Sequence, residues 1–149
     1  MTKPVRYPAL LLDKQKCLRN ISRMAEKARR NNLIFRPHFK THQSALIGEW
    51  FREAGISAIT VSSLWMAEYF AGHGWNDITV AFPVNVREAD RINRLSKRIS
   101  VNLVVDSAIA VQMLDCRLDR PVNAFVKIDA GYGRAGLPSD DLESLDILM

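Results

Sequence analysis

Basic side chains alternate with apolar ones in the stretch Arg-Pro-His-Phe-Lys-Thr-His, which begins at Arg36 and ends at His42. In a β-strand, alternate side chains share a face. One face would then carry Arg36, His38 and Lys40, joined by His42 if the strand continues. Unpaired buried charge is costly, so this row does not suit an ordinary core. It predicts a site for an anionic ligand, where cationic neighbours favour a neutral, nucleophilic Lys40.

The composition is that of a globular protein, with 149 residues, 48% of them hydrophobic and 25% charged. No apolar run approaches the roughly 20 residues that would span a bilayer, and the first residues lack the apolar core of a signal peptide. The two cysteines, Cys17 and Cys116, lie far apart and have no partners at metal-ligand spacing. They are expected to be buried free thiols, and the protein is expected to be cytoplasmic.

The net charge of +5 is concentrated between Lys14 and Arg30. A basic helix of this kind could bind nucleic acid or an anionic membrane. No aromatic residue interleaves with these charges, as a single-strand nucleic-acid binder would need. The segment is therefore predicted to be a solvated helix face, and neither nucleic acid nor a membrane is an expected partner.

Apolar segments that end in a polar residue recur along the chain, and their end residues are spaced 21 to 23 residues apart. Such a period indicates one supersecondary unit that repeats. The five predicted strands are Ile34–Lys40, Ser57–Ser62, Asp77–Asn85, Ser100–Asp106 and Val122–Asp129. Their polar end residues are Lys40, Ser62, Asn85, Asp106 and Asp129.

Helical patterns lie between these strands, and an earlier strand, Pro8–Leu12, precedes a helix capped by Asp13. Strict alternation predicts an α/β fold with a parallel sheet. Units of this length favour a (β/α)8 TIM-type barrel, and no Gly-x-Gly-x-x-Gly supports a dinucleotide site. A complete barrel takes roughly 250 residues, so residues 1–149 are expected to be its N-terminal portion, about five of eight units. The polar strand ends would then lie at the ligand-binding end of the barrel.

The fifth predicted strand also has a mixed face, formed by Asn123, Phe125, Lys127 and Asp129, which should point into the barrel. A glycine-rich segment from Gly131 to Gly136 follows it and contains Arg134. Glycines let the backbone turn tightly, which could bring this arginine to the mouth of the barrel. A glycine-rich turn with a surface arginine is the alternative.

Three segments together resemble the fold-type III pyridoxal-phosphate enzymes. They are Tyr-Pro-Ala-Leu-Leu-Leu-Asp from Tyr7, Arg-Pro-His-Phe-Lys-Thr-His from Arg36, and Lys-Ile-Asp-Ala-Gly-Tyr-Gly-Arg-Ala-Gly from Lys127. The most similar group is the D-threonine aldolase and D-serine dehydratase branch, which is similar to alanine racemase in its N-terminal barrel. Pro-His-x-Lys-Thr-His is specific to that branch, whereas Asp-x-Gly-x-x-Arg-x-Gly is shared more widely. The resemblance covers essentially the whole chain.

The resemblance implies that Lys40 forms a Schiff base with pyridoxal 5'-phosphate, with His38, His42 and Arg134 as further cofactor-binding residues. Arg134 matches the arginine that, in alanine racemases, hydrogen-bonds the cofactor's phenolic oxygen. Lys127 matches a lysine that is carbamylated in some of those enzymes and helps to hold that arginine. The phosphate-binding tyrosine of the racemase pattern is Ser44 here, and the basic residue that often follows Thr-His is Gln43. Phosphate binding is therefore expected from later barrel loops.

The resemblance also implies a function and partners. The protein is expected to be a homodimeric lyase or racemase that acts on D-amino acids by aldol cleavage, β-elimination or racemisation. The rest of the barrel, a C-terminal β-domain and any divalent-metal ligands would lie beyond this sequence, and no metal ligand is expected within it. The 149-residue piece alone is expected to be inactive. The alternatives are a non-catalytic pyridoxal-phosphate homeostasis protein and an inactive truncated fragment.

Overall fold

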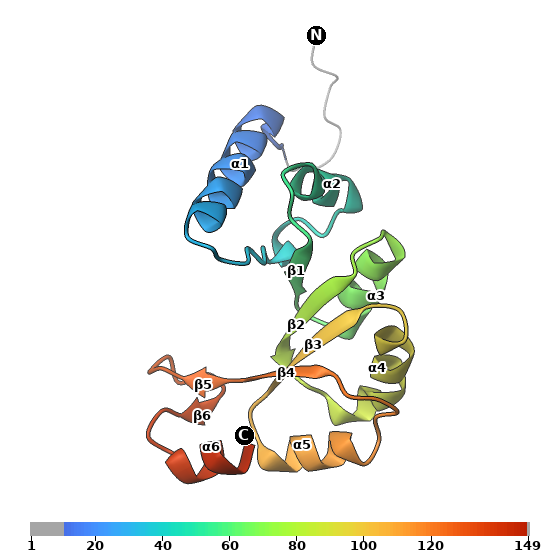
Figure 1. Ribbon diagram of the computed structural model, residues 1–149, viewed down its shortest axis with the longest axis vertical. Coiled ribbons are helices and arrows are strands. Elements are labelled where there is room, and N and C mark those ends of the chain that lie inside the picture. Colours follow the sequence, from blue (N-terminus) through green and yellow to red (C-terminus); the bar gives the residue numbers. More distant parts are fainter. Residues whose placement is uncertain (1–10, 149) are drawn as a thin grey trace.

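The computed structural model describes residues 11–148, which alternate between helices and strands (Figure 1). The elements, with η for 3-10 helices, are α1 (Lys14–Arg30), η1 (Phe39–Thr41), α2 (Ala45–Glu53), β1 (Ala58–Val61), α3 (Leu64–Gly72), β2 (Asp77–Pro83), η2 (Val86–Glu88), α4 (Ala89–Ser96), β3 (Ser100–Val105), α5 (Ala108–Asp115), β4 (Asn123–Val126), β5 (Ile128–Asp129), β6 (Leu137–Pro138) and α6 (Leu142–Leu148).

Four strands form one parallel sheet in the order β1-β2-β3-β4, so the sheet follows the chain order. Figure 1 shows α3, α4 and α5 in succession along one face of this sheet. That face is apolar and fully covered at Ile59, Ile78 and Leu103, which pack with Phe70 and Ile92 from the helices. The sheet and the helices bury their apolar faces against each other, which favours a parallel α/β architecture. The predicted α/β fold with a parallel sheet is confirmed. The closed barrel is not confirmed by a sheet of four strands.

The predicted strand Ile34–Lys40 is wrong over most of its length. Only one parallel bridge, between His38 and Thr60, attaches it to β1, and the chain then turns into η1. The Nδ1 atom of His38 accepts a hydrogen bond from the Lys40 N–H at 3.3 Å, which favours a turn over an extended strand. Pro37 lacks an N–H, which further weakens a ladder here.

The predicted strand Val122–Asp129 is divided at Lys127. The Lys127 N–H donates to the Val105 carbonyl, and the Lys127 carbonyl accepts from the Leu137 N–H, each at 2.8 Å. The second bond brings β6 back against β5, so the chain between them is a closed loop beyond the end of β4 (Figure 1).

Helix α1 begins where Asp13 was predicted to cap it, with the carboxylate accepting the Lys16 N–H at 2.9 Å. Its basic residues are all exposed, while Ile21 and Ala25 are buried, so the predicted solvated face is confirmed. Residues 8–10 of the predicted strand Pro8–Leu12 lie outside the described residues, and Leu11 and Leu12 are not in a strand.

Both cysteines are free, as predicted, but Cys17 is only half-buried and Cys116 is exposed. The expectation that both are buried is therefore wrong: Cys17 lies in the first turn of α1, and Cys116 follows the last residue of α5. None of the helices within residues 11–148 is both long and apolar enough to cross a membrane.

Candidate functional site

Lys40 lies in the turn η1 with an exposed side chain, and it makes no ion pair with any of residues 11–148. Its neighbour Phe39 is completely buried and packs against Phe51, Phe70 and Trp75, with ring centroids 5.0 to 5.1 Å away. Adjacent side chains on this turn thus take opposite roles. Phe39 fixes the turn in the core, and Lys40 presents its amine to the outside.

His38 is the one predicted site residue directly connected to Lys40. Its Nδ1 accepts the Lys40 N–H, so the proton of the neutral ring is on Nε2. Burial lowers the pKa of His38 from its usual value, and the positive charge of Lys40 lowers it further. At neutral pH the ring is therefore an uncharged hydrogen-bond donor beside Lys40.

His42 lies apart from Lys40, in the aromatic cluster around Phe39. Its ring centroid is 4.5 Å from that of Phe39 and 5.8 Å from that of Phe51. Nδ1 accepts the Ser44 N–H at 3.1 Å, whereas Nε2 is buried without a hydrogen-bond partner among residues 11–148. The shared face predicted for Lys40 and His42 is wrong because η1 ends the two-residue alternation. A direct contact of His42 with a cofactor stays a prediction.

His42 should make the stability of the protein sensitive to mild acid. Burial lowers the pKa of His42, so below the unfolded value of about 6.5 the unfolded chain binds more protons than the folded one. Stability is then lost as pH falls from about 6.5 through the lower folded pKa. We expect His42→Phe in the complete protein to reduce this loss and to change the free energy of unfolding at pH 7 by at most about 1 kcal/mol.

Urea unfolding at pH 7.5 and 5.5 measures this difference for the parent and the variant. His73→Phe is the control, because His73 is an exposed histidine that hydrogen-bonds the Tyr69 carbonyl at the end of α3. Equal losses of stability in the parent and in His42→Phe would contradict the prediction.

Arg36 does not supply a free positive charge near Lys40, contrary to expectation. Its guanidinium forks onto Asp77, with distances of 2.6 Å to Oδ1 and 2.7 Å to Oδ2. This pairing holds the pKa of the Asp77 carboxyl below its usual range, and a hydrogen bond from the Asn102 side chain lowers it further. Since His38 and His42 are neutral as well, the predicted row of cations around Lys40 is wrong.

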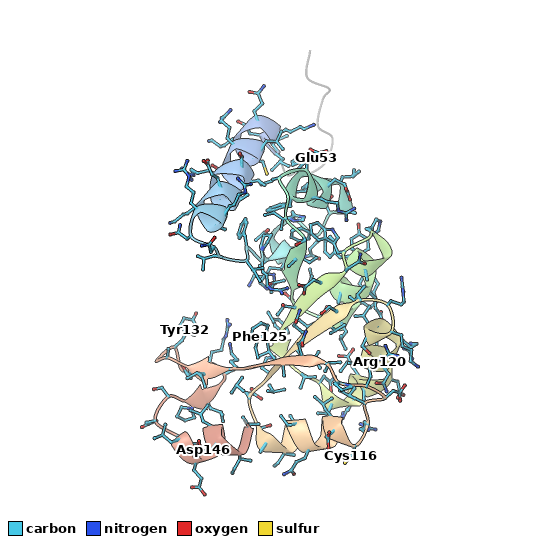
Figure 2. All side chains as sticks on the ribbon, viewed as in Figure 1. Glu53, Cys116, Arg120, Phe125, Tyr132 and Asp146 are labelled. Atoms are coloured by element: carbon cyan, nitrogen blue, oxygen red, sulfur yellow. The ribbon has the colours of Figure 1, made fainter. Side chains whose placement is uncertain are left out.

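Arg134 is exposed on the closed loop between β5 and β6. One oxygen of Asp129 organises that loop by accepting the N–H groups of Gly131, Tyr132 and Gly133 at 2.8 to 3.1 Å. These bonds hold the pKa of Asp129 below its usual value, and the bond from Gly133 has the largest effect. The Arg134 guanidinium lies 5.4 Å from the Tyr132 ring centroid. Figure 2 labels Tyr132 on this loop and Phe125 on β4. The Phe125 side chain is half exposed.

No hydrogen bond or ion pair within the described part of the chain connects Arg134 with Lys40. Ser62 and Asp106 come directly after β1 and β3, and Asn85 comes two residues after β2. Lys40 lies in η1, and Arg134 lies in the loop after β5, which belongs to a separate two-stranded sheet. Carboxyl ends of parallel strands lie at one edge of a sheet, where ligands bind in such folds. Ser62, Asn85 and Asp106 therefore lie at that edge of the four-stranded sheet, and the placement of Lys40 and Arg134 beside them stays a prediction.

The sequence reading missed a row of polar side chains in the strands themselves, formed by Asp77, Asn102 and Asn123 with Arg36. The signal was present, since a buried asparagine in an otherwise apolar strand requires a hydrogen-bond partner. Its partners could not be read from the sequence, because they depend on the register of the sheet.

The site fits the aldehyde of pyridoxal phosphate, because a lysine amine that is exposed and unpaired is free to bond to it. The Lys40 amine and the His38 Nε2–H beside it are nitrogen donors, which suit an anionic cofactor. Among residues 11–148, no three His, Cys, Asp or Glu side chains come close enough to hold a metal.

A family model described as alanine racemase, N-terminal domain, matches residues 12–147. The chain is 33% identical to D-threo-3-hydroxyaspartate dehydratase of Delftia sp. (strain HT23) over 138 residues, which is 90% of this chain and 36% of that protein. It is 28% identical over 145 residues to 3-hydroxy-D-aspartate aldolase of Paracoccus denitrificans (strain Pd 1222), covering 92% of this chain and 37% of the aldolase.

The solved structure of the Delftia dehydratase matches with a TM-score of 0.85 at 30% identity, over 92% of this chain and 37% of that chain. D-threonine aldolase from Filomicrobium marinum matches with a TM-score of 0.81 at 25% identity, over 89% of this chain and 37% of that chain. The sequence thus spans 33% to 37% of the length of these and other curated relatives that it matches. The chain belongs to the alanine racemase N-terminal domain family, and within it to the D-threonine aldolase-like branch of the fold-type III pyridoxal-phosphate enzymes.

Proposed function

We propose that Lys40 binds pyridoxal phosphate covalently and that the complete protein is a lyase acting on D-amino acids with a hydroxyl group on the β-carbon. The observation that carries this proposal is the exposed, unpaired amine of Lys40 on a turn fixed by Phe39, within a chain of this family. Bound pyridoxal phosphate supplies an electron sink for the bonds at the substrate α-carbon.

The substrate class follows from what the relatives have in common. Their names specify 3-hydroxyaspartate and threonine, in each case as the D form. Both amino acids carry a hydroxyl on the β-carbon, which dehydration removes and aldol cleavage converts to an aldehyde. Dehydration would begin with loss of the α-proton, whereas aldol cleavage would break the bond between the α- and β-carbons and then return a proton to the α-carbon. Both reactions would need negative charge at the α-carbon to be stabilised, and we propose that this chain contributes that part of the site.

Each residue of the site has a proposed role that suits its charge. The Lys40 amine, once released by substrate, can take or return a proton at the α-carbon. His38 is neutral and can donate the proton on Nε2 as a hydrogen bond to an anionic oxygen. The Arg134 guanidinium can donate to the phenolic oxygen of the cofactor. His42 is proposed to support the site through the turn that carries Lys40.

The remaining features of the whole protein are proposals as well. Residues 1–149 would form the N-terminal part of a (β/α)8 barrel, consistent with the share of the relatives that they match. A divalent metal, if the complete protein uses one, would be bound by residues outside this sequence. We also propose a homodimer and, because Cys17 and Cys116 are both free, a reducing compartment such as the cytoplasm.

An assay of the complete protein tests the proposed function. The protein is supplied with pyridoxal phosphate and incubated with D-threo-3-hydroxyaspartate, D-threonine, D-serine and the L form of each. Dehydration yields a 2-oxo acid and ammonia, whereas aldol cleavage yields glycine and an aldehyde. We expect one of these product pairs from the D forms alone. Racemised amino acid as the main product, or no product from any D form, would contradict the proposal.

A further inference from the structure

A row of polar side chains crosses the sheet on the face opposite the helices. Asp77, at the start of β2, receives the Arg36 guanidinium on one side and the Asn102 amide at 2.8 Å on the other. The oxygen of Asn102 in turn accepts the Asn123 amide at 3.0 Å. Side chains from β2, β3 and β4 are thereby joined to the segment that leads into η1.

This row attaches residues 36–40, the Lys40 segment, to the sheet. The main chain of the segment makes few bonds to the sheet. The segment has one bridge to β1: the Thr60 N–H donates to the Pro37 carbonyl at 2.9 Å, and the Thr60 hydroxyl donates to the Arg36 carbonyl at 3.4 Å. Arg36 lies two residues before His38, and Ala58 two residues before Thr60. The Arg36 side chain thus reaches past β1 to Asp77, and the small side chain of Ala58 leaves space for it.

We infer that Asp77 is a positioning residue for Lys40, acting through Arg36, an inference that rests on the proposed function of Lys40. Asp77 lies at the amino end of β2, whereas Lys40 lies in η1, after the His38–Thr60 bridge, so the proposed effect of Asp77 on Lys40 is indirect. Two parallel hydrogen bonds fix the orientation of a guanidinium as well as its position. They hold the main chain of Arg36, and with it the start of the turn.

A second ion pair in the chain has the same chemistry without a connection to Lys40. Arg91 of α4 forks onto Glu68 of α3 at 3.2 and 2.7 Å. The side-chain exposures are 30% and 36%, compared with 23% and 35% for Arg36 and Asp77. Arg91 also pairs with Glu88 at 2.9 Å, so it keeps one carboxylate partner when Glu68 is replaced, whereas Arg36 pairs with Asp77 alone among residues 11–148. The cost in stability should therefore be somewhat smaller for the control. Glu68→Gln is the matched control for Asp77→Asn, because each substitution removes the charge and keeps the size of the side chain.

The test uses the complete protein and two readouts. Hydrogen exchange of the Thr60, Lys40 and Gln43 amides reports on the segment, since each of them donates to a residue from Pro37 to Phe39. Absorbance of lysine-bound pyridoxal phosphate, titrated with the cofactor and with pH, reports on the amine. We expect Asp77→Asn to speed exchange at these amides and to weaken covalent cofactor binding about tenfold, because small displacements of reacting groups are costly. Glu68→Gln should leave both near the parent values.

Equal effects of the two substitutions, or none from Asp77→Asn, would overturn the inference and leave only a structural ion pair. If Asp77→Asn fails to fold, Arg36→Lys replaces it, because lysine retains the charge but cannot fork onto the carboxylate. Arg36→Lys should then shift both readouts in the same direction. If the parent protein shows no lysine-bound cofactor band, the proposed function fails instead, and the exchange data alone decide whether Asp77 fixes this segment.

Discussion

Lys40→Ala should abolish the absorbance band of lysine-bound pyridoxal phosphate in the complete protein. It should also lower turnover of D-amino acids by about 10²- to 10⁴-fold, the usual effect of losing one proton-transferring side chain. The free energy of unfolding should change by less than about 0.5 kcal/mol, because the side chain is exposed and the turn is fixed by Phe39. Absorbance titration, steady-state kinetics and urea unfolding measure the three quantities.

Lys97→Ala provides the control for this substitution. Lys97 is an exposed lysine that follows α4 and pairs with Asp119 at 3.3 Å, so it lies outside the proposed site. The control should retain both the band and the turnover. An unchanged band in Lys40→Ala would show that another lysine binds the cofactor.

Gly136→Ala should open the loop that carries Arg134. A Cβ at this position would lie 2.8 Å from the Asp129 nitrogen and 2.9 Å from the Ile128 carbonyl carbon, closer than real atoms approach. The φ angle of +118° is also unfavourable for alanine. We expect the amide of Leu137 to exchange faster, because its bond to Lys127 closes the loop, and turnover to fall with the displacement of Arg134.

Gly131→Ala distinguishes the effect of backbone strain from the effect of the steric clash. Gly131 has a similar φ of +99°, but nothing lies within 4 Å of a Cβ placed there. The backbone strain of about 1–2 kcal/mol is therefore common to both variants, and only Gly136→Ala adds the clash with β5. Indistinguishable exchange rates for the Leu137 amide in the two variants would contradict the clash.

The sequence was sufficient for the α/β architecture because its strongest pattern is periodic. The apolar segments end at regular intervals, and Ser62, Asn85 and Asp106 do follow strands of a parallel sheet. Each of these predictions depends on local alternation and on burial of one face, which a single sequence records.

The sequence was insufficient to predict contacts between side chains that are far apart along the chain. The prediction for His42 assumed that alternation continued past His38, but a local hydrogen bond from the Lys40 N–H ends the strand there. The predicted charge on Arg36 ignored Asp77, which is 41 residues away and becomes a neighbour only through the register of β1 and β2. Such pairings depend on tertiary structure, which local patterns do not encode.

The most direct test of the central claim is to locate the bound cofactor on the chain. Borohydride reduces the imine between a lysine and pyridoxal phosphate to a stable amine, so the modified peptide can be isolated and sequenced by mass spectrometry. We predict that the complete protein, loaded with pyridoxal phosphate and reduced, carries the phosphopyridoxyl group on Lys40. The same group on Lys127 or on any other lysine, with Lys40 unmodified, would contradict the assignment.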